Sequence, residues 1–359
     1  MRKQFAQLLD RLQTWETKLP TSKQVSLLSN IGLSEVDALR EVWPHIPLQS
    51  RRLLISKLLD MSEFDVLLDF TEVFLLALED PDEQVRLGAL EGLWEYDEED
   101  FVPTLIRMMD SDPSVPIRAE AAMNLGRFAL KGELEELSPQ TTDLVRRALI
   151  TAWNSPDQDV EVRRRALESV ACLTGDDIGD MIRAAYRDKD ERMNVSAVYA
   201  MGQTLDDVWA PYVLKELKSP RPEMRYEAAR SAGALELADA VPTLLEMTHD
   251  PDAEVRTAVI EALGDIGGER AVQALLELAR SDDEAIREAA LDALDVADFG
   301  ENPLGPGILS WLLGQDAGPM GVPGWDEELD EDDLMDDDNF GDKDDEDEWG
   351  RDADRDRWN

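Results

Sequence analysis

The chain has 359 residues, and 36 Lys and Arg against 80 Asp and Glu give it a formal net charge of −44. A charge this negative argues against binding to nucleic acids or anionic membranes, because both are bound through clustered Lys and Arg. One cysteine, Cys172, and two histidines, His45 and His249, exclude an intrachain disulfide and a thiolate metal site, and are too few for most catalytic dyads. These counts favour a soluble, cytoplasmic, non-enzymatic protein without a cofactor or metal.

The sequence repeats, and each unit can be aligned on one position, here called the mark. The marks are Arg52, Arg86, Arg118, Arg163, Asn194, Arg225, Arg256 and Arg287, the last five being 31 residues apart. The residue before the mark and those three and seven after it are apolar, which places them on one arc of a helix. Glycine stands eight residues after four marks, at 126, 202, 233 and 264, and there it predicts a helix C-cap.

A second helical run precedes each marked one, and a turn with Asp or Ser before Pro separates the two, as at Asp80, Asp112 and Asp250. Each unit is therefore a helix–turn–helix hairpin, and we find no alternating pattern long enough for a strand. One hairpin cannot bury both of its faces, so the units must stack. The predicted fold is all-α, an α-solenoid of about eight hairpins.

The segment DPDAEVR (250–256), followed by ALG (262–264), resembles a HEAT repeat of the short bacterial variety that is also found in phycobilin lyases. The resemblance covers residues 34–299 and implies a superhelical, protein-binding scaffold, without implying an activity. We expect residues 1–33 to form an N-terminal helical cap and the Gly/Pro-rich residues 300–324 to form a linker. Residues 325–359 carry 19 acids and four bases, so a disordered acidic tail is expected.

The mark falls within the apolar arc, where an arginine needs a partner. An Asp recurs four residues earlier, at 82, 159, 190, 252 and 283. It is placed to cap the second helix and to accept from an Arg of its own or the adjacent repeat, and the resemblance implies the same Asp–Arg ladder. We expect the ladder to break at Asn194, Ser114 and Arg221, and Arg256→Ala to lower the melting temperature.

The predicted partner-binding residues are those five after each mark, which share one exposed stripe. They are Glu91, Met123, Glu168, Tyr199, Arg230, Glu261 and Asp292. In solenoids of this kind the second helices line the concave surface, and Met123 and Tyr199 are the expected anchors for another protein. The simpler interpretation of these seven residues is that they are ordinary surface.

The basic run at 163–165 has two interpretations as well. It is either a solvated face, or a local anion site or dock for the chain's own tail.

Two other functions remain open at this stage. One is a phycobilin-lyase-like enzyme subunit, which rests on the repeat resemblance alone. The other is an acidic chaperone or nucleic-acid mimic for a basic protein, which the net charge suggests, and the tail has aromatic anchors for such a basic partner at Trp325, Phe340 and Trp349. No His-Glu pair is present, which excludes a HEAT-type deoxyhypusine hydroxylase, and Cys172 is interpreted as a structural thiol. An EF-hand in the tail is disfavoured because Phe340 occupies a ligand position.

Overall fold

The computed structural model describes residues 3–15 and 20–301, and within them every regular element is an α-helix or a short 3₁₀ helix. The all-α prediction is therefore confirmed. Residues 302–324 of the expected linker and the whole of the expected tail, with its EF-hand template, lie outside the described residues. No helix in the described ranges is both long enough and apolar enough to cross a membrane.

In the part of the chain that the structure describes, eight helical hairpins follow one another from residue 33, in agreement with the predicted repeat number. Their first helices are α3 (Leu33–Val42), α5 (Thr71–Ala77), α7 (Val102–Ser111), α9 (Pro139–Asn154), α11 (Asp176–Tyr186), α13 (Ala210–Glu216), α15 (Val241–Met247) and α17 (Glu269–Leu278). Their second helices are α4 (Leu48–Phe64), α6 (Glu83–Gly92), α8 (Val115–Glu133), α10 (Val160–Val170), α12 (Glu191–Gln203), α14 (Pro222–Ala234), α16 (Ala253–Ile266) and α18 (Glu284–Glu301). Before them stand α1 (Lys3–Gln13) and α2 (Ser22–Val25).

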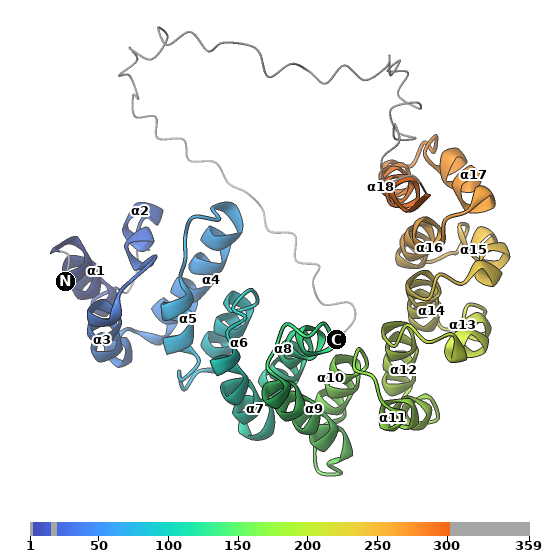
Figure 1. Cartoon of the computed structure of the whole chain (residues 1–359). Helices are drawn as coiled ribbons and strands as arrows, with labels where there is room; N and C mark the ends of the chain where they lie inside the picture. Colours follow the sequence, from blue (N-terminus) through green and yellow to red (C-terminus); the bar gives the residue numbers. More distant parts are fainter. Residues whose placement is uncertain (1–2, 16–19, 302–359) are drawn as a thin grey trace, which may run out of the picture.

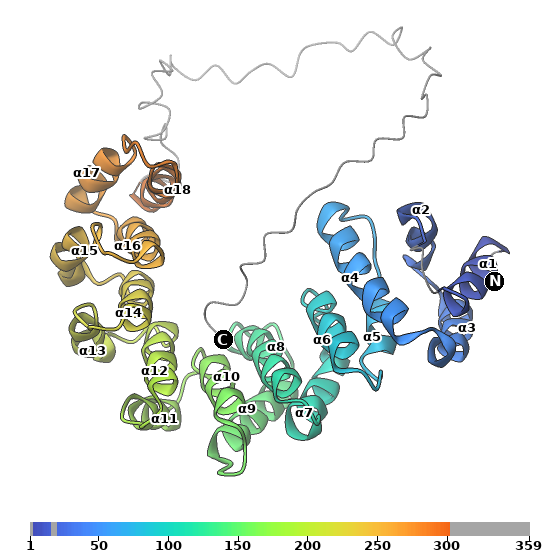
Figure 2. The ribbon, with the colours of Figure 1, turned by 180° about the vertical axis from the view of Figure 1, so that it is seen from behind.

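The hairpins stack into a curved solenoid. From α6 to α18 the second helices form the inner layer of the arc, and α7 to α17 form the outer layer, as both views show (Figure 1, Figure 2). Consecutive inner helices pack directly on one another, α8 on α10, α12 on α14 and α14 on α16 among them. The concave surface is therefore built from equivalent faces of successive inner helices.

The apolar offsets of the repeat form the core between the two layers. The residues three after the mark are buried in seven consecutive repeats, and so are those seven after it. The small side chains at the first of these offsets are Ala89, Ala121, Ala166, Ala197, Ala228, Val259 and Ala290. Because each repeat buries the same positions against its neighbours, the solenoid has one continuous hydrophobic core rather than separate domain cores.

The repeated glycine has a different role from the predicted C-cap. Gly126, Gly202, Gly233 and Gly264 lie inside their helices, before the final residue of each. A Cβ on Gly202 would lie 2.9 Å from the Cα of Ser231 on the next inner helix. The C-cap prediction was therefore wrong. The glycine is needed because successive inner helices approach almost backbone to backbone at this offset.

Three inner helices end instead at a left-handed residue eleven after the mark. These residues are Leu205 (φ 52°), Glu236 (φ 49°) and Gly267 (φ 63°). Only glycine adopts this conformation without steric cost, since a Cβ crowds the carbonyl oxygen in the left-handed region. The repeat therefore tolerates non-glycine residues at its helix ends, at an energetic cost.

Leu205→Gly is expected to stabilise the protein by about 1 kcal/mol, because it removes that cost from an exposed position. Urea unfolding followed by circular dichroism measures the change. The matched substitution Leu134→Gly removes another exposed leucine, one that ends α8 without a positive φ, and should not stabilise. Equal effects of the two substitutions would contradict the explanation.

Two mark arginines, Arg86 and Arg225, join the turn of their own repeat to an aspartate in the turn of the next. Nη1 of Arg86 donates to the carbonyl oxygen of Asp80 at 2.8 Å, while Nε and Nη2 form a bidentate pair with Asp112, both at 2.9 Å. Arg225 binds the carbonyl oxygen of Ser219 and the carboxylate of Asp250 in the same way. A ladder exists, and at both steps its acid lies six residues before the next mark.

The Asp four before the mark acts mainly as a helix cap. Oδ1 of Asp252, for example, accepts from the backbone N–H groups of Glu254 and Val255. Asp82 both caps α6 and pairs with Arg52 of the preceding repeat, which is the one step that follows the predicted spacing within the described residues.

Only part of the predicted set of ladder breaks is correct. Ser114 breaks nothing, because Asp112, two residues earlier, accepts from Arg86. At the step from Asn194 to the next repeat the break is confirmed. Nδ2 of Asn194 donates to backbone carbonyl groups of its own repeat, and Ser219 supplies no carboxylate opposite it.

Candidate functional site

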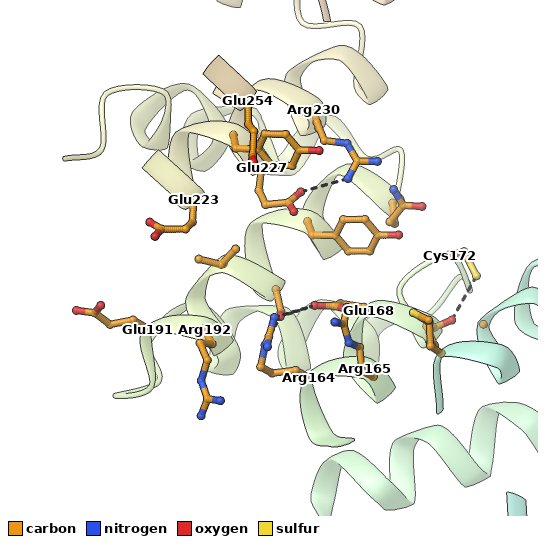
Figure 3. A pocket seen from close by; sticks show the side chains of 18 of the residues that line it. Arg164, Arg165, Glu168, Cys172, Glu191, Arg192, Glu223, Glu227, Arg230 and Glu254 are labelled. Carbon is orange, nitrogen blue, oxygen red and sulfur yellow. Dashed lines mark hydrogen bonds and ion pairs between the residues drawn. The ribbon is translucent and has the colours of Figure 1, made fainter. Parts of the chain in front are cut away.

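A groove of about 860 Å³ lies on the concave surface, where α8, α10, α12 and α14 adjoin. Six arginines and six acidic residues line it, so the groove is formally neutral within a chain of charge −44. Its arginines are Arg127, Arg164, Arg165, Arg192, Arg221 and Arg230. Figure 3 shows Glu227 and Arg230 of α14 on one side and Arg164, Arg165 and Glu168 of α10 on the other.

The structure brings most of the predicted stripe together on this face. Met123, Glu168, Tyr199 and Arg230 line the groove. Two smaller hollows of about 200 and 500 Å³ continue it toward α18, and Glu261 lines both of them. Asp292 lines the last hollow, whereas Glu91 on α6 is exposed outside all three. That these residues bind a partner stays a prediction.

An arginine flanked by two tyrosine rings lines the groove. The Cζ atom of Arg230 lies 5.9 Å from the ring centroid of Tyr199 and 5.7 Å from that of Tyr226, within cation–π range. Its only ion-pair contact in the described residues is with Glu227, at 3.8 Å. Within those residues the guanidinium and both tyrosine hydroxyl groups make no hydrogen bond. The two rings therefore orient a cation whose N–H groups remain available to a ligand.

The basic run at 163–165 is largely neutralised by its own neighbours. Arg164 pairs with Glu161 at 2.7 Å and donates to the Ser196 hydroxyl, and Arg165 pairs with Glu168 at 2.9 Å. The side chain of Arg164 is only 13% exposed, so a solvated face was the wrong interpretation for it. The cation best placed to receive an anion is instead Arg230, on the next-but-one inner helix.

Glu227 is a site residue that the sequence interpretation missed. Its side chain is 17% exposed, and its Oε2 atom is buried without a hydrogen-bond partner in the described residues. Burial raises the pKa of Glu227 to about 7. The positive charges of Arg230, Arg164 and Arg165 oppose that shift, and the negative charge of Glu168 adds to it. Shifted carboxyl groups in clefts often mark functional sites.

A signal for Glu227 was present in the sequence. It stands two residues after its mark, an offset occupied by Gly88, Ser196, Ala258 and Ala289 in other repeats. The third and fourth repeats also carry charges there, Glu120 and Arg165. Charged residues at an offset that is small or apolar in the other repeats therefore identify the middle of the concave face as distinct.

Glu227→Gln is expected to reduce the pH dependence of stability. The folded-state pKa is raised, so the folded protein binds the proton more tightly than the unfolded chain does, and stability rises as pH falls from about 8 toward 5. Over this range the natural protein should gain about 1–3 kcal/mol relative to the variant. Urea unfolding of both proteins at pH 8 and 5.5 measures this difference. Identical pH dependence would contradict the assignment.

Cys172 lies at the edge of the groove but is unsuited to nucleophilic chemistry. Burial raises the pKa of its thiol to about 11, and its Sγ contacts the carbonyl oxygen of Ser169 at 3.7 Å. A thiol that stays protonated at neutral pH is a weak nucleophile. The two histidines contact neighbouring residues, His45 the carbonyl oxygen of Glu41 and His249 the hydroxyl of Thr248. The described residues hold no group of three or more potential metal ligands.

The family model for HEAT repeats matches residues 71–156 and 210–295. Together with the stacked hairpins, this shows that the chain contains HEAT repeats. No curated protein matches the sequence.

Several solved structures are similar to the chain. The complex of CpcE and CpcF of phycocyanin lyase from Nostoc sp. PCC7120 is 19% identical, with a TM-score of 0.41 over 55% of this chain and 77% of that one. Human deoxyhypusine hydroxylase is 20% identical, with a TM-score of 0.32 over 74% and 96%. The Kap95:Nup1 complex is 15% identical, with a TM-score of 0.46 over 82% and 46%. At these values nothing about activity or partners follows.

Proposed function

We propose that the protein is a non-catalytic scaffold that binds a segment of another protein along its concave surface. The observation that carries this proposal is the groove across α8 to α14, which is lined by Arg230, by the two tyrosine rings beside it and by Met123. Tyrosine and arginine are enriched among the few residues that supply most of the binding energy in protein interfaces, and methionine adapts to varied apolar surfaces. A single cysteine suits a reducing compartment, so we place the protein in the cytoplasm.

The rigidity of the inner helices supports this function. Each helix is held by a buried apolar arc and, at several repeats, by an arginine that binds two turns. The side chains facing the groove therefore start close to their bound positions, which lowers the entropic cost of association. The formal neutrality of the groove also leaves room for a partner segment with mixed charges.

Tyr199→Ala is expected to weaken binding of a partner isolated with the full chain by about thirtyfold, as for a loss of about 2 kcal/mol at an interface anchor. Isothermal titration calorimetry with the purified partner measures the change. Leu144→Ala is the matched control, since it removes an exposed apolar side chain from the outer helix α9 and should change affinity less than twofold. Unchanged binding by Tyr199→Ala, or an equal loss in the control, would contradict the proposal.

The net charge of −44 supports a second candidate function, a chaperone or mimic that binds basic proteins. Binding of that kind would weaken steeply with salt, because exposed charges are screened over about 8 Å at physiological ionic strength. It would also be insensitive to Tyr199→Ala. The phycobilin-lyase-like alternative predicts uptake of a bilin, which appears as a visible absorption band. The two measurements distinguish these alternatives from the scaffold.

A further inference from the structure

We propose that the groove around Arg230 binds the acidic, aromatic-containing segment 325–359 of the same chain. The tail would then occupy part of the surface that we assign to a partner. This inference goes beyond the proposed function, because a contact between tail and groove requires no partner. It stands on the geometry of the groove, the composition of the tail and the distance between them.

The first step is the chemistry of the receiving site. The side chain of Arg230 is 45% exposed, and contact of its guanidinium with the rings of Tyr199 and Tyr226 restricts its orientation. A guanidinium is shaped to donate two parallel hydrogen bonds to one carboxylate, and the free hydroxyl groups of the two tyrosines are further donors. The occupant that this arrangement fits is a carboxylate with an apolar group nearby.

The second step is the chemistry of the tail. Of its 35 residues 19 are Asp or Glu, so a carboxylate is available to Arg230 at nearly every position along the tail. Trp325, Phe340 and Trp349 lie among them, and each has acidic residues within two positions. An aromatic ring of this kind can pack on Met123 and Val195, apolar residues that line the same groove. Carboxylates and rings together match the donors and apolar atoms of the groove.

The connection between α18 and the tail must be long enough to reach the groove. Residues 302–324 span at most about 76–83 Å when fully extended. The inner helices pack about 8–10 Å apart, so α14 lies about 16–20 Å from α18 and α10 about 32–40 Å. The connecting stretch is therefore long enough to bring the acidic segment onto the groove. A tethered segment also has an effective concentration near the millimolar range, which makes a weak contact significant.

The charge of the groove differs from that of the solenoid as a whole. Residues 61–324 carry 23 basic and 55 acidic side chains, so most of the solenoid repels the tail. The groove departs from this acidic excess, because six arginines there balance six acids. Charges beyond about 8 Å are largely screened at physiological ionic strength, so this local balance decides where the tail is accepted. Protonation of Glu227, which contacts Arg230, would make the groove net positive and strengthen the contact below pH 7.

Photo-cross-linking of the full chain tests the proposal. p-Benzoylphenylalanine replaces Trp325, Phe340 or Trp349, one position at a time, and cross-linked peptides are identified by mass spectrometry after irradiation. We expect intramolecular cross-links to α12 and α14, and a higher yield at pH 6 than at pH 8. Cross-links only to other parts of the solenoid, only between two molecules, or at no position would each overturn the proposal.

Variants in the same full-length background sharpen the test. Arg230→Glu should lower the yield about tenfold, the size expected when a charge-assisted hydrogen bond is lost, and Arg230→Gln should lower it in the same direction without reversing the charge. Arg183→Glu is the matched control. Arg183 also stacks on an aromatic ring, with its Cζ 5.1 Å from the centroid of Trp209, and is 40% exposed, but on the outer helix α11. An equal loss in the control, in variants that melt like the natural protein, would overturn the assignment to the groove.

Discussion

Arg225→Ala is expected to destabilise the protein by about 3–5 kcal/mol, because it leaves the carboxylate of Asp250 buried without its partner. Nε and Nη2 of Arg225 each lie 2.7 Å from an Asp250 oxygen, and the Asp250 side chain is only 6% exposed. Burial raises the pKa of Asp250, but the hydrogen bonds from Arg225 and the Asp252 backbone outweigh it and hold the pKa below its usual value. Urea unfolding followed by circular dichroism measures the loss.

Arg256→Ala is the matched control, at the same position one repeat later. Arg256 donates to the carbonyl oxygen of Asp250 at 2.9 Å and has no ion pair within the described residues. Its removal should therefore cost about 1 kcal/mol, the contribution of an ordinary hydrogen bond. The double variant Arg225→Met/Asp250→Leu should recover most of the stability that Arg225→Ala loses, because no charge is then left buried. Equal losses for Arg225→Ala and Arg256→Ala would contradict the ladder.

The sequence predicts the ladder but not its partners, and the reason is geometric. Periodicity identifies Arg225 as a charge on an apolar arc, and burial then requires a partner. Each turn can hold two acids that could pair with the arginine, however, as the turn with Asp250 and Asp252 does. Which of them the arginine reaches depends on how the turn projects toward the preceding repeat, a tertiary relationship that the repeat period alone does not contain. In the structure Asp250 faces Arg225, and Asp252 caps α16.

For the candidate site too, the sequence predicts some features, whereas others depend on tertiary packing. The offset of five correctly places Met123, Tyr199 and Arg230 on the concave face, because this requires only the helical period and the stacking of inner helices. It does not show that Tyr226, from a different offset, completes the stack around Arg230. Nor does it show that Glu227 is buried, since that depends on how closely α12 and α14 pack. The exposed offset follows from the helical period of a single repeat, whereas the groove depends on how neighbouring repeats pack.

Gly202 lies where α12 and α14 approach each other closely, next to Ser231. Gly202→Ala is expected to destabilise the protein by about 1–3 kcal/mol, the range for overpacking a close contact. A Cβ at this position would lie 2.7 Å from the Oγ of Ser231 and 2.9 Å from its Cα. The hydroxyl is itself fixed by donating to the carbonyl oxygen of Val198 at 2.8 Å, so it cannot simply rotate away. The α12 and α14 backbones must therefore separate.

The intrinsic helix propensity of alanine opposes this loss, which makes the test demanding. Gly179→Ala is the control on the outer helix α11, where the nearest atom to an added Cβ is the end of the Arg183 side chain, at 3.2 Å. Alanine should there stabilise the protein by about 0.5–1 kcal/mol. Urea unfolding of both variants measures the contrast in sign. Because α12 and α14 also carry Tyr199 and Arg230, the same separation should loosen the stack, so Gly202→Ala is expected to weaken partner binding as well, whereas Gly179→Ala is not. A Gly202→Ala variant as stable as Gly179→Ala would show that the inner helices do not need this close approach.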